Sequence, residues 1–223
     1  MSNEVSHCHS LEEIANSIRA QMELSNSARE EALKICREVI QLSSRTIRAI
    51  HREEMTNAQT LLAEAKSRVE RAKSVLKEHP DLLHAGYVHD SQKEYVEAEA
   101  MLAIVTGQPI PSPEVMGVEP AAYLNGLAEA ASESRRHVLD RLRLDDIAQA
   151  ERVLKRMDDI YYELVTFDFP DAITGGLRRT TDALRAVLER TRADLTLTLS
   201  QKRLQSSLQS ALERLSGSDN RVD

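Results

Sequence analysis

The 223-residue sequence contains few glycine, proline and aromatic residues. It contains 7 glycines and 6 prolines, and only 3% of its residues are aromatic. Chains that are poor in these types and rich in Ala, Leu, Glu and Arg form helices more readily than strands and tight turns. The length is sufficient for a core that needs no disulfide or metal to hold it together. We therefore expect an all-α fold.

Cysteine and long apolar runs are also scarce. Cys8 and Cys36 are the only cysteines, too few for a disulfide framework, which indicates a reducing compartment. No run approaches the roughly 18 apolar residues of a membrane span. The first ten residues have no apolar stretch typical of a signal peptide. The sequence predicts a soluble, cytoplasmic protein with no membrane partner.

Turn residues divide the chain into helical segments. The run Ser10 to Glu13 has the pattern of a capping box, and Pro80 and the loop 107–113 interrupt the periodicity later in the chain. Six helices are predicted, approximately at 10–52, 55–78, 81–106, 120–141, 144–166 and 177–215. No linker separates domains. We expect one single-domain helical bundle of six to seven helices over residues 10–215, with a disordered N-terminus (1–9) and tail (216–223).

The third predicted helix places acidic residues on its apolar face. At 100° per residue, Glu94 and Glu97 fall on the side that carries the apolar positions, with Asp90 beside them. Those apolar positions are Leu83, Tyr87, Ala98, Met101, Leu102 and Val105. Carboxylates in such positions are either solvated at the edge of the core or gathered at a site.

The fourth predicted helix offers two more carboxylates. Glu129 and Glu133 are one turn apart and lie beside the small residues Ala122, Gly126 and Ala130. Small residues let another helix approach closely, so a hairpin of the two helices would bring four carboxylates together.

Four carboxylates in one place repel one another unless a cation neutralises them. With only oxygen ligands and no nearby histidine, Mg²⁺ or Mn²⁺ is expected rather than Zn²⁺. Ordinary surface placement of the same glutamates is the alternative.

The first predicted helix has a basic face. Five basic residues and one glutamine lie within a narrow arc of this helix: Lys34, Arg37, Gln41, Arg45, Arg48 and Arg52. We call these five cations and one glutamine the basic ridge. A solvated face paired with scattered acids is one interpretation. The other is a wall that binds phosphates within a protein whose net charge of −7 otherwise argues weakly against nucleic-acid binding.

Three stretches resemble a known family. "LKICREVIQLSSRTIRAIHR" (Leu33 to Arg52), "KEYVEA" (Lys93 to Ala98) and "YLNGLAEAASESRR" (Tyr123 to Arg136) are similar to segments of the translin superfamily, specifically its translin-associated factor X type (Trax-like). The resemblance covers approximately residues 29–204. It implies a translin-like fold of about seven helices that assembles into a hollow octamer.

The resemblance also implies a function. In this type, acids bind a divalent metal and cut single-stranded RNA within the shell. Glu94 and Glu97 match the two glutamates of the family's "EYVEA", Glu129 matches an aspartate, and Glu133 matches a glutamate. A further family acid falls at Ser91, which leaves open whether Asp90 replaces it.

These inferences combine into one functional prediction. We expect a Mg²⁺- or Mn²⁺-dependent endoribonuclease with Glu94, Glu97 and Glu129 as metal ligands and Glu133 as a further catalytic acid or base. RNA binding is assigned to the ridge cations, which are Lys34, Arg37, Arg45, Arg48 and Arg52.

The predicted partners are single-stranded RNA, further copies of the chain and, as an open option, a translin-like subunit. Subunit contacts are expected along the last helix, through Leu184, Val187, Leu188, Leu195 and Leu199. The alternatives are a non-catalytic translin-like shell that binds single-stranded nucleic acid, and a purely structural helical oligomer.

Overall fold

The computed structural model describes residues 10–219, and every regular element in this part of the chain is a helix. Six are long: α1 (Leu11–His51), α2 (Met55–Val75), α4 (Gly86–Thr106), α6 (Pro120–Arg143), α7 (Ile147–Leu164) and α9 (Leu177–Asp219). Three are single turns: α3 (Pro80–Leu83), α5 (Pro113–Met116) and α8 (Asp171–Thr174). The all-α prediction is confirmed. Residues 1–9 and 220–223 lie outside the described part, and α9 continues past the predicted boundary at residue 215.

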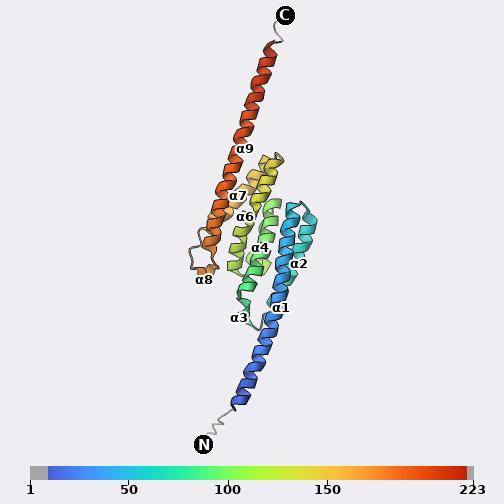
Figure 1. The fold of residues 1–223 in the computed structure, drawn as a ribbon, viewed down its shortest axis with the longest axis vertical. Helices are drawn as coiled ribbons and strands as arrows, with labels where there is room; N and C mark the ends of the chain where they lie inside the picture. The colour runs from blue at the N-terminus through green and yellow to red at the C-terminus, as the bar shows by residue number, and fades with distance from the viewer. Residues whose placement is uncertain (1–9, 220–223) are drawn as a thin grey trace.

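Helices α4 and α6 form the centre of the bundle (Figure 1). They pack against each other, with α1 and α2 on one side and α7 and α9 on the other. The first half of α1 and the last half of α9 extend beyond the bundle in opposite directions (Figure 1). The acidic helices of the sequence therefore occupy the interior of the fold, and the basic helix α1 lies directly beside α4.

Local sequence signals explain where the long helices begin and end. Ser10 and Glu13 form the predicted capping box, in which Glu13 N donates to Ser10 Oγ at 3.2 Å and Ser10 N donates to Glu13 Oε2 at 2.9 Å. Gly107 ends α4 in the left-handed conformation, with φ of 75°. Pro120 opens α6 at the first helical position, where its missing N–H leaves no helical hydrogen bond unmade.

The predicted helix over 81–106 is wrong at its start. The structure has a separate turn of helix, α3, and then Ala85 in an extended conformation with φ −69° and ψ 146°. Because a helix cannot pass through an extended residue, α4 begins only at Gly86.

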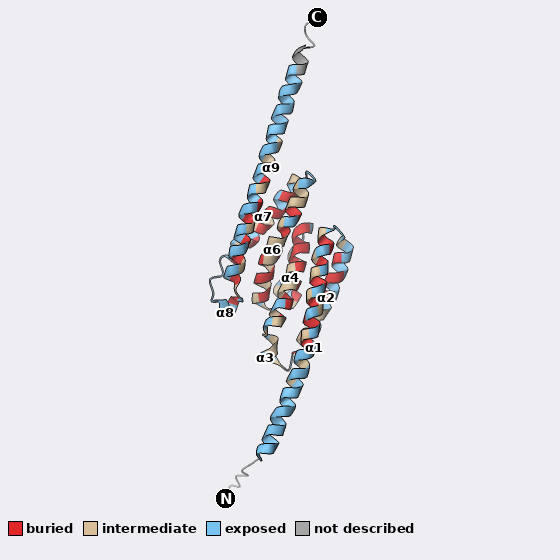
Figure 2. Ribbon diagram, in the orientation of Figure 1, coloured by how far each residue is buried: buried red, intermediate tan, exposed pale blue. Residues whose placement is uncertain are grey.

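The core lies along the inward faces of the long helices (Figure 2). Met101 of α4 and Met157 of α7 are completely buried there, and Cys36 of α1 is a buried free thiol that behaves as a small apolar residue. None of the described helices combines the length and the apolar character that crossing a membrane requires.

The subunit contacts predicted for Leu184, Leu188 and Leu195 of the last helix are wrong, whereas Val187 and Leu199 of the same set are partly buried against the core. Leu184, Leu188 and Leu195 are 0%, 2% and 7% exposed within a single chain. They belong to the core because α9 packs against α6 and α7. Their periodicity marked a buried face, but the partner is in the same chain.

Candidate metal centre

The site is built where α4 and α6 approach most closely. A Cβ on Gly126 of α6 would lie 2.6 Å from Val96 Cβ and 2.7 Å from the Lys93 carbonyl oxygen of α4. Ala122 and Ala130, on either side of Gly126 along α6, are completely buried. The close helix contact expected from these small residues is therefore present, and it brings the acidic positions of the two helices within reach of each other.

Three of the four predicted carboxylates converge. Glu94 and Glu97 of α4 and Glu129 of α6 each offer a carboxylate oxygen, and these oxygens all lie within 4.8 Å of one another. The side chains are partly buried. We call Glu94, Glu97 and Glu129 the carboxylate cluster.

Burial, together with charge repulsion, makes ionisation of the cluster unfavourable. Burial, with the charges of Glu94, Glu129 and Glu133, raises the pKa of Glu97 to about 8. Burial also raises the pKa of Glu94; Lys93 opposes this effect, and Glu129 and Asp90 add to it. In the absence of a cation, Glu97 is therefore largely protonated at neutral pH, and a bound cation would favour its ionised form.

The donor set fits a hard divalent cation. Three carboxylates supply oxygen ligands only, as Mg²⁺ and Mn²⁺ prefer, and they are held on two packed helices. They supply more negative charge than one neighbouring ammonium neutralises.

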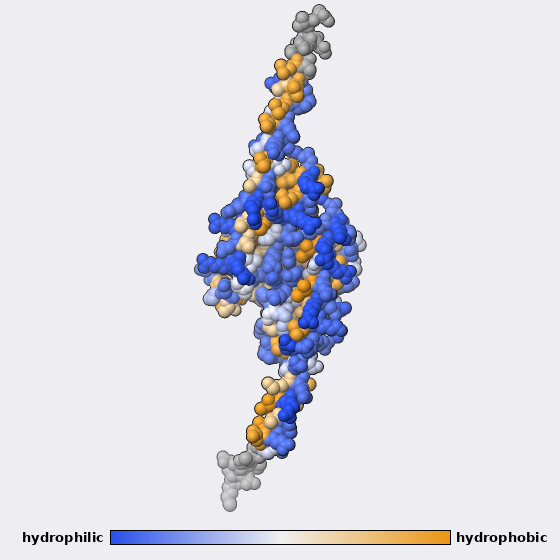
Figure 3. All heavy atoms as spheres, in the orientation of Figure 1, coloured by the Kyte–Doolittle hydropathy of each residue, from blue (hydrophilic) through white to orange (hydrophobic). Residues whose placement is uncertain are grey.

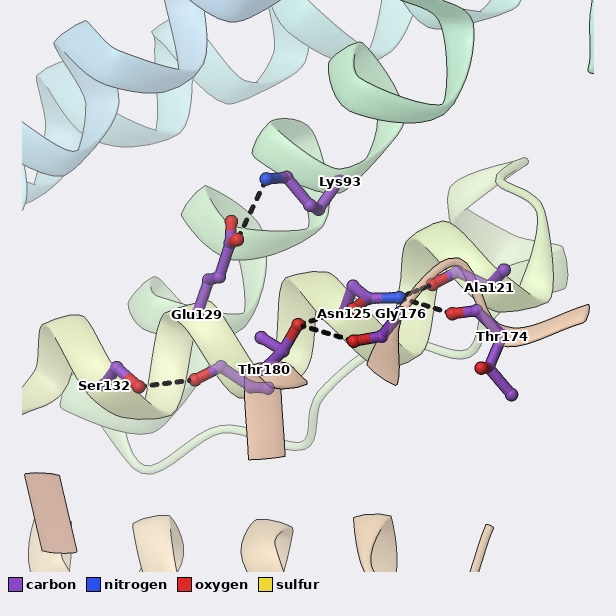
Figure 4. A network of polar contacts seen from close by, with 9 residues as sticks. Lys93, Ala121, Asn125, Glu129, Ser132, Thr174, Gly176 and Thr180 are labelled. Atoms are coloured by element: carbon purple, nitrogen blue, oxygen red, sulfur yellow. Dashed lines mark hydrogen bonds and ion pairs between the residues drawn. The ribbon is translucent and has the colours of Figure 1, made fainter. Parts of the chain in front are cut away.

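That ammonium belongs to Lys93, which the sequence did not single out. Its Nζ donates to Glu129 Oε1 at 2.9 Å across the two helices (Figure 4). Burial alone lowers the pKa of Lys93, but the hydrogen bond and charge of Glu129 and the charges of Glu94 and Asp90 raise it overall. Lys93 thus stays charged and fixes the position of the Glu129 carboxylate.

Glu133 occupies a different environment from the other three acids. It lies outside the group whose oxygens converge, although its charge acts on Glu97. Its Oε1 is 2.7 Å from Nε2 of His51, the last residue of α1. A histidine therefore lies beside one of the four predicted acids because α1 ends beside α6, although the converging group itself contains glutamates only. Only the packing of α1 could reveal this contact, since the two residues are 82 positions apart.

The structure also places the two residues around the missing family acid. Ser91 is buried, and its Oγ donates to the Val88 carbonyl at 2.8 Å. Asp90 is exposed and outside the cluster, although its charge raises the pKa of Glu94. Asp90 thus acts on the site through its charge.

A polar network fixes α6 one turn before Glu129 (Figure 4). Asn125 Nδ2 donates to the Thr174 carbonyl at 2.7 Å, and Asn125 Oδ1 accepts from Thr180 Oγ1 at 2.7 Å. The side chain of Asn125 therefore ties α6 to α8 and α9, which holds the register of the Glu129 turn.

The basic ridge lies on the surface of α1. Its five cations are exposed, and none of them forms an ion pair with any residue in the range 10–219: Lys34, Arg37, Arg45, Arg48 and Arg52. The opposite side of the helix, with Cys36, Val39 and Ile50, is buried. Ion-pair partners in the described part of the chain therefore do not account for these charges.

Fold and site together define an all-helical bundle with a carboxylate cluster between its two central helices. No family model matches the sequence. The chain is 32% identical over 185 residues to the uncharacterized protein MJ0175 of Methanocaldococcus jannaschii, with 82% of each chain covered.

Solved structures identify the family. AfC3PO, alone and in a complex with duplex RNA, is 34% identical and superposes with TM-scores of 0.78 and 0.77, over 84% of this chain and 97% of that chain. Apo-NeC3PO, at 22% identity, shows the same fold with a TM-score of 0.75 over 85% of this chain and 99% of that chain. The chain belongs to the C3PO/translin family.

Proposed function

We propose that the protein is a metal-dependent endoribonuclease of the Trax-like type that cuts single-stranded RNA inside a hollow oligomer. The observation that carries the proposal is the convergence of Glu94, Glu97 and Glu129 on one point between α4 and α6. Glutamates that only face solvent would not be gathered in a partly buried position, because this position disfavours their charge and raises the pKa of Glu97 to about 8.

Each residue of the site has a proposed task. Glu94, Glu97 and Glu129 would hold Mg²⁺ or Mn²⁺, which supplies Lewis-acid chemistry at a phosphoryl oxygen and makes water more acidic. Glu133, which is outside the converging group, would accept the proton of the attacking water. His51 holds the Glu133 carboxylate through its Nε2 atom, and Lys93 holds Glu129.

The exposed cations of α1 support RNA as the substrate. They lack ion-pair partners in the described part of the chain and follow one face of a helix that ends at His51, beside Glu133. Phosphates bound along this face would lead the strand toward the carboxylates. The duplex RNA in the AfC3PO complex makes a duplex the natural comparison substrate.

Assembly would involve the projecting ends of α1 and α9. Both ends expose apolar residues (Figure 3). On α1 the exposed apolar residues include Leu11, Ile14, Ile18 and Met22, and on α9 they include Leu197, Leu204, Leu208 and Leu212. Each set recurs at helical spacing, as helix faces that pack against a partner do. We propose that these faces join copies of the chain, with eight copies expected.

One observation favours a second candidate, the non-catalytic translin-like shell. Lys93 already neutralises part of the cluster through Glu129, so the carboxylates are not wholly dependent on a metal. The test is cleavage of a labelled single-stranded RNA with Mg²⁺, with Mn²⁺ and with EDTA, alongside binding of the same RNA. Metal-dependent cleavage supports the nuclease. Binding of the RNA without cleavage in either metal would support the non-catalytic shell.

A further inference from the structure

A second polar site lies beside the carboxylate cluster. The ends of α1 and α6 border an open cavity of about 370 Å³. Its lining comes from His51, Arg52, Glu53, His137, Asp140, Arg141, Arg143 and Leu144. None of the proposed metal ligands is among these residues.

Three nitrogen atoms of the lining residues have no hydrogen-bond partner among residues 10–219. They are Nδ1 of His51, Nε2 of His137 and Nε of Arg141, and all three atoms are buried. The side chain of His51 is 4% exposed, and His137 is 6% exposed. Buried polar atoms in proteins are nearly always paired. Nε of Arg141 is a donor and the ring of His137 has one N–H to give, so these atoms indicate a ligand that accepts hydrogen bonds. Nδ1 of His51 donates only when the ring is charged, because Nε2 already donates to the Glu133 carboxylate.

The charges around the cavity favour an anion. Arg52, Arg141 and Arg143 face only two acids, Glu53 and Asp140. Arg141 pairs with Glu53, Nη1 of Arg143 lies 3.5 Å from Oδ1 of Asp140, and Arg52 forms no ion pair in the described range. Burial and the charge of Arg141 lower the pKa of His137, but a neutral imidazole still donates one N–H. A metal is the poorer fit, because no three acidic, histidine or cysteine side chains of the cavity converge as the carboxylate cluster does.

Two residues connect this cavity to the proposed RNA path. Arg52 is both the last residue of the basic ridge and part of the cavity wall. His51 contacts Glu133 through Nε2 and lines the cavity with the same ring. An anion in the cavity would therefore lie one imidazole ring away from the proposed catalytic acid.

We propose that this cavity binds a phosphate group of the RNA backbone, next to the phosphate that is cut. His137 and Arg141 would donate to it, Arg52 would supply further positive charge, and His51 would join it to Glu133. Guanidinium and imidazole N–H groups are the donors that proteins use for phosphate. The proposal rests on the proposed function in naming RNA as the source of the phosphate, but phosphate binding itself can be measured without cleavage.

The test begins with the metal-free protein in EDTA. Long-range ¹H–¹⁵N spectra of the histidine rings are recorded while inorganic phosphate is added, and then while a short single-stranded RNA is added. We expect saturable shifts of the His51 and His137 signals with both probes, and no shift of His84, which is exposed at the end of α3. Shifts with inorganic phosphate but not with RNA would overturn the assignment of the ligand to the RNA backbone. Absence of shifts with both would overturn the site.

Variants then connect the cavity to RNA. His137→Leu should weaken RNA binding in EDTA by about tenfold or more, because it removes the N–H donor of a charge-assisted hydrogen bond, and His84→Leu should not change it. Far-UV circular dichroism and melting establish that both variants fold. Unchanged RNA affinity in folded His137→Leu would contradict the proposal. Phosphate binding in a protein that never cleaves RNA would refute the nuclease and leave the cavity site intact. Cleavage of RNA without any phosphate-induced shift of the histidine signals would support the nuclease and refute the cavity site.

Discussion

Nε2 of His51, at the end of α1, lies 2.7 Å from Oε1 of Glu133, in the middle of α6. This contact joins the helix that carries the exposed cations to the helix that carries two of the acids. It also separates Glu133 from the three carboxylates that converge. The four acids therefore have two environments in the structure: Glu94, Glu97 and Glu129 converge and can hold a metal, and Glu133 is held by an imidazole.

Replacement of Glu97 by glutamine should abolish cleavage and leave RNA binding nearly unchanged. Glutamine keeps the shape of the side chain but lacks the charge that a hard cation needs, so we expect the cleavage rate to fall by at least about 100-fold. The control is Glu99→Gln, which removes another partly buried carboxylate of α4 that lies near Lys66 and outside the cluster. Cleavage by Glu97→Gln at the wild-type rate would remove Glu97 from the mechanism.

The metal-free protein should lose stability as the pH rises from about 4.5 to about 8. Over this range the folded chain keeps a proton on Glu97, whose pKa is raised to about 8, while the unfolded chain has released it. The free energy of unfolding should fall by up to about 1.4 kcal/mol per pH unit from this group.

Urea unfolding in EDTA from pH 5 to 9 measures this slope. Saturating Mg²⁺ should flatten it, because the cation binds the ionised carboxylate, and Glu97→Gln should flatten it without metal. The same slope in wild type and Glu97→Gln would show that Glu97 is not the group responsible.

Gly126→Ala should destabilise the fold and disturb the cluster. The added Cβ would meet Val96 Cβ at 2.6 Å and the Lys93 carbonyl oxygen at 2.7 Å, so α4 and α6 must separate. We expect the free energy of unfolding to fall by about 1–3 kcal/mol, with weaker Mg²⁺ binding by calorimetry. Gly86→Ala is the matched control, since nothing lies within 4 Å of its added Cβ. Equal stability of the two variants would contradict the close packing.

Removal of three ridge arginines should weaken RNA binding and reduce its salt dependence. Each phosphate that is no longer bound by Arg37, Arg45 or Arg48 should lower the log–log slope by about 0.7 for a single strand. A control with the same charge change is the alanine triple of Arg178, Arg179 and Arg190, which are exposed on α9 across the bundle from α1. An unchanged salt-dependence slope in the ridge variant would show that RNA does not bind along the basic ridge.

Light scattering should find an assembly several times the 25.0 kDa chain, with eight copies expected. Replacing Leu204, Leu208 and Leu212 by glutamine should reduce the mass toward that of one chain, because these side chains are 60%, 57% and 61% exposed on the projecting end of α9. Val115→Gln, at an equally exposed residue outside α9, should leave the mass unchanged.

The proposed enclosure of the site predicts a substrate preference: short single strands should be cut well and folded duplex poorly. A stable, active wild-type monomer at micromolar concentration would contradict the enclosed chamber, even if the carboxylates prove catalytic.

Much of the fold was predictable because helix signals are local. The capping box at Ser10, the glycine at residue 107 and the proline at residue 120 each act within a few positions of the chain. The 3.6-residue period likewise places Glu94 and Glu97 beside the core face of α4 before any partner is known. Local sequence was therefore sufficient for the long helices, for their inward faces and for the small residues that let α4 and α6 meet.

Contacts between distant helices depend instead on the packed bundle. Nothing in the local sequence pairs Lys93 with Glu129 or His51 with Glu133, because each pair depends on how two helices pack and where they end. The same cause explains the error over Leu184 and Leu188, whose spacing shows that a face is covered but not by which chain. Periodicity identifies the side of a helix that is buried; the partner on that side is selected by packing across the whole bundle.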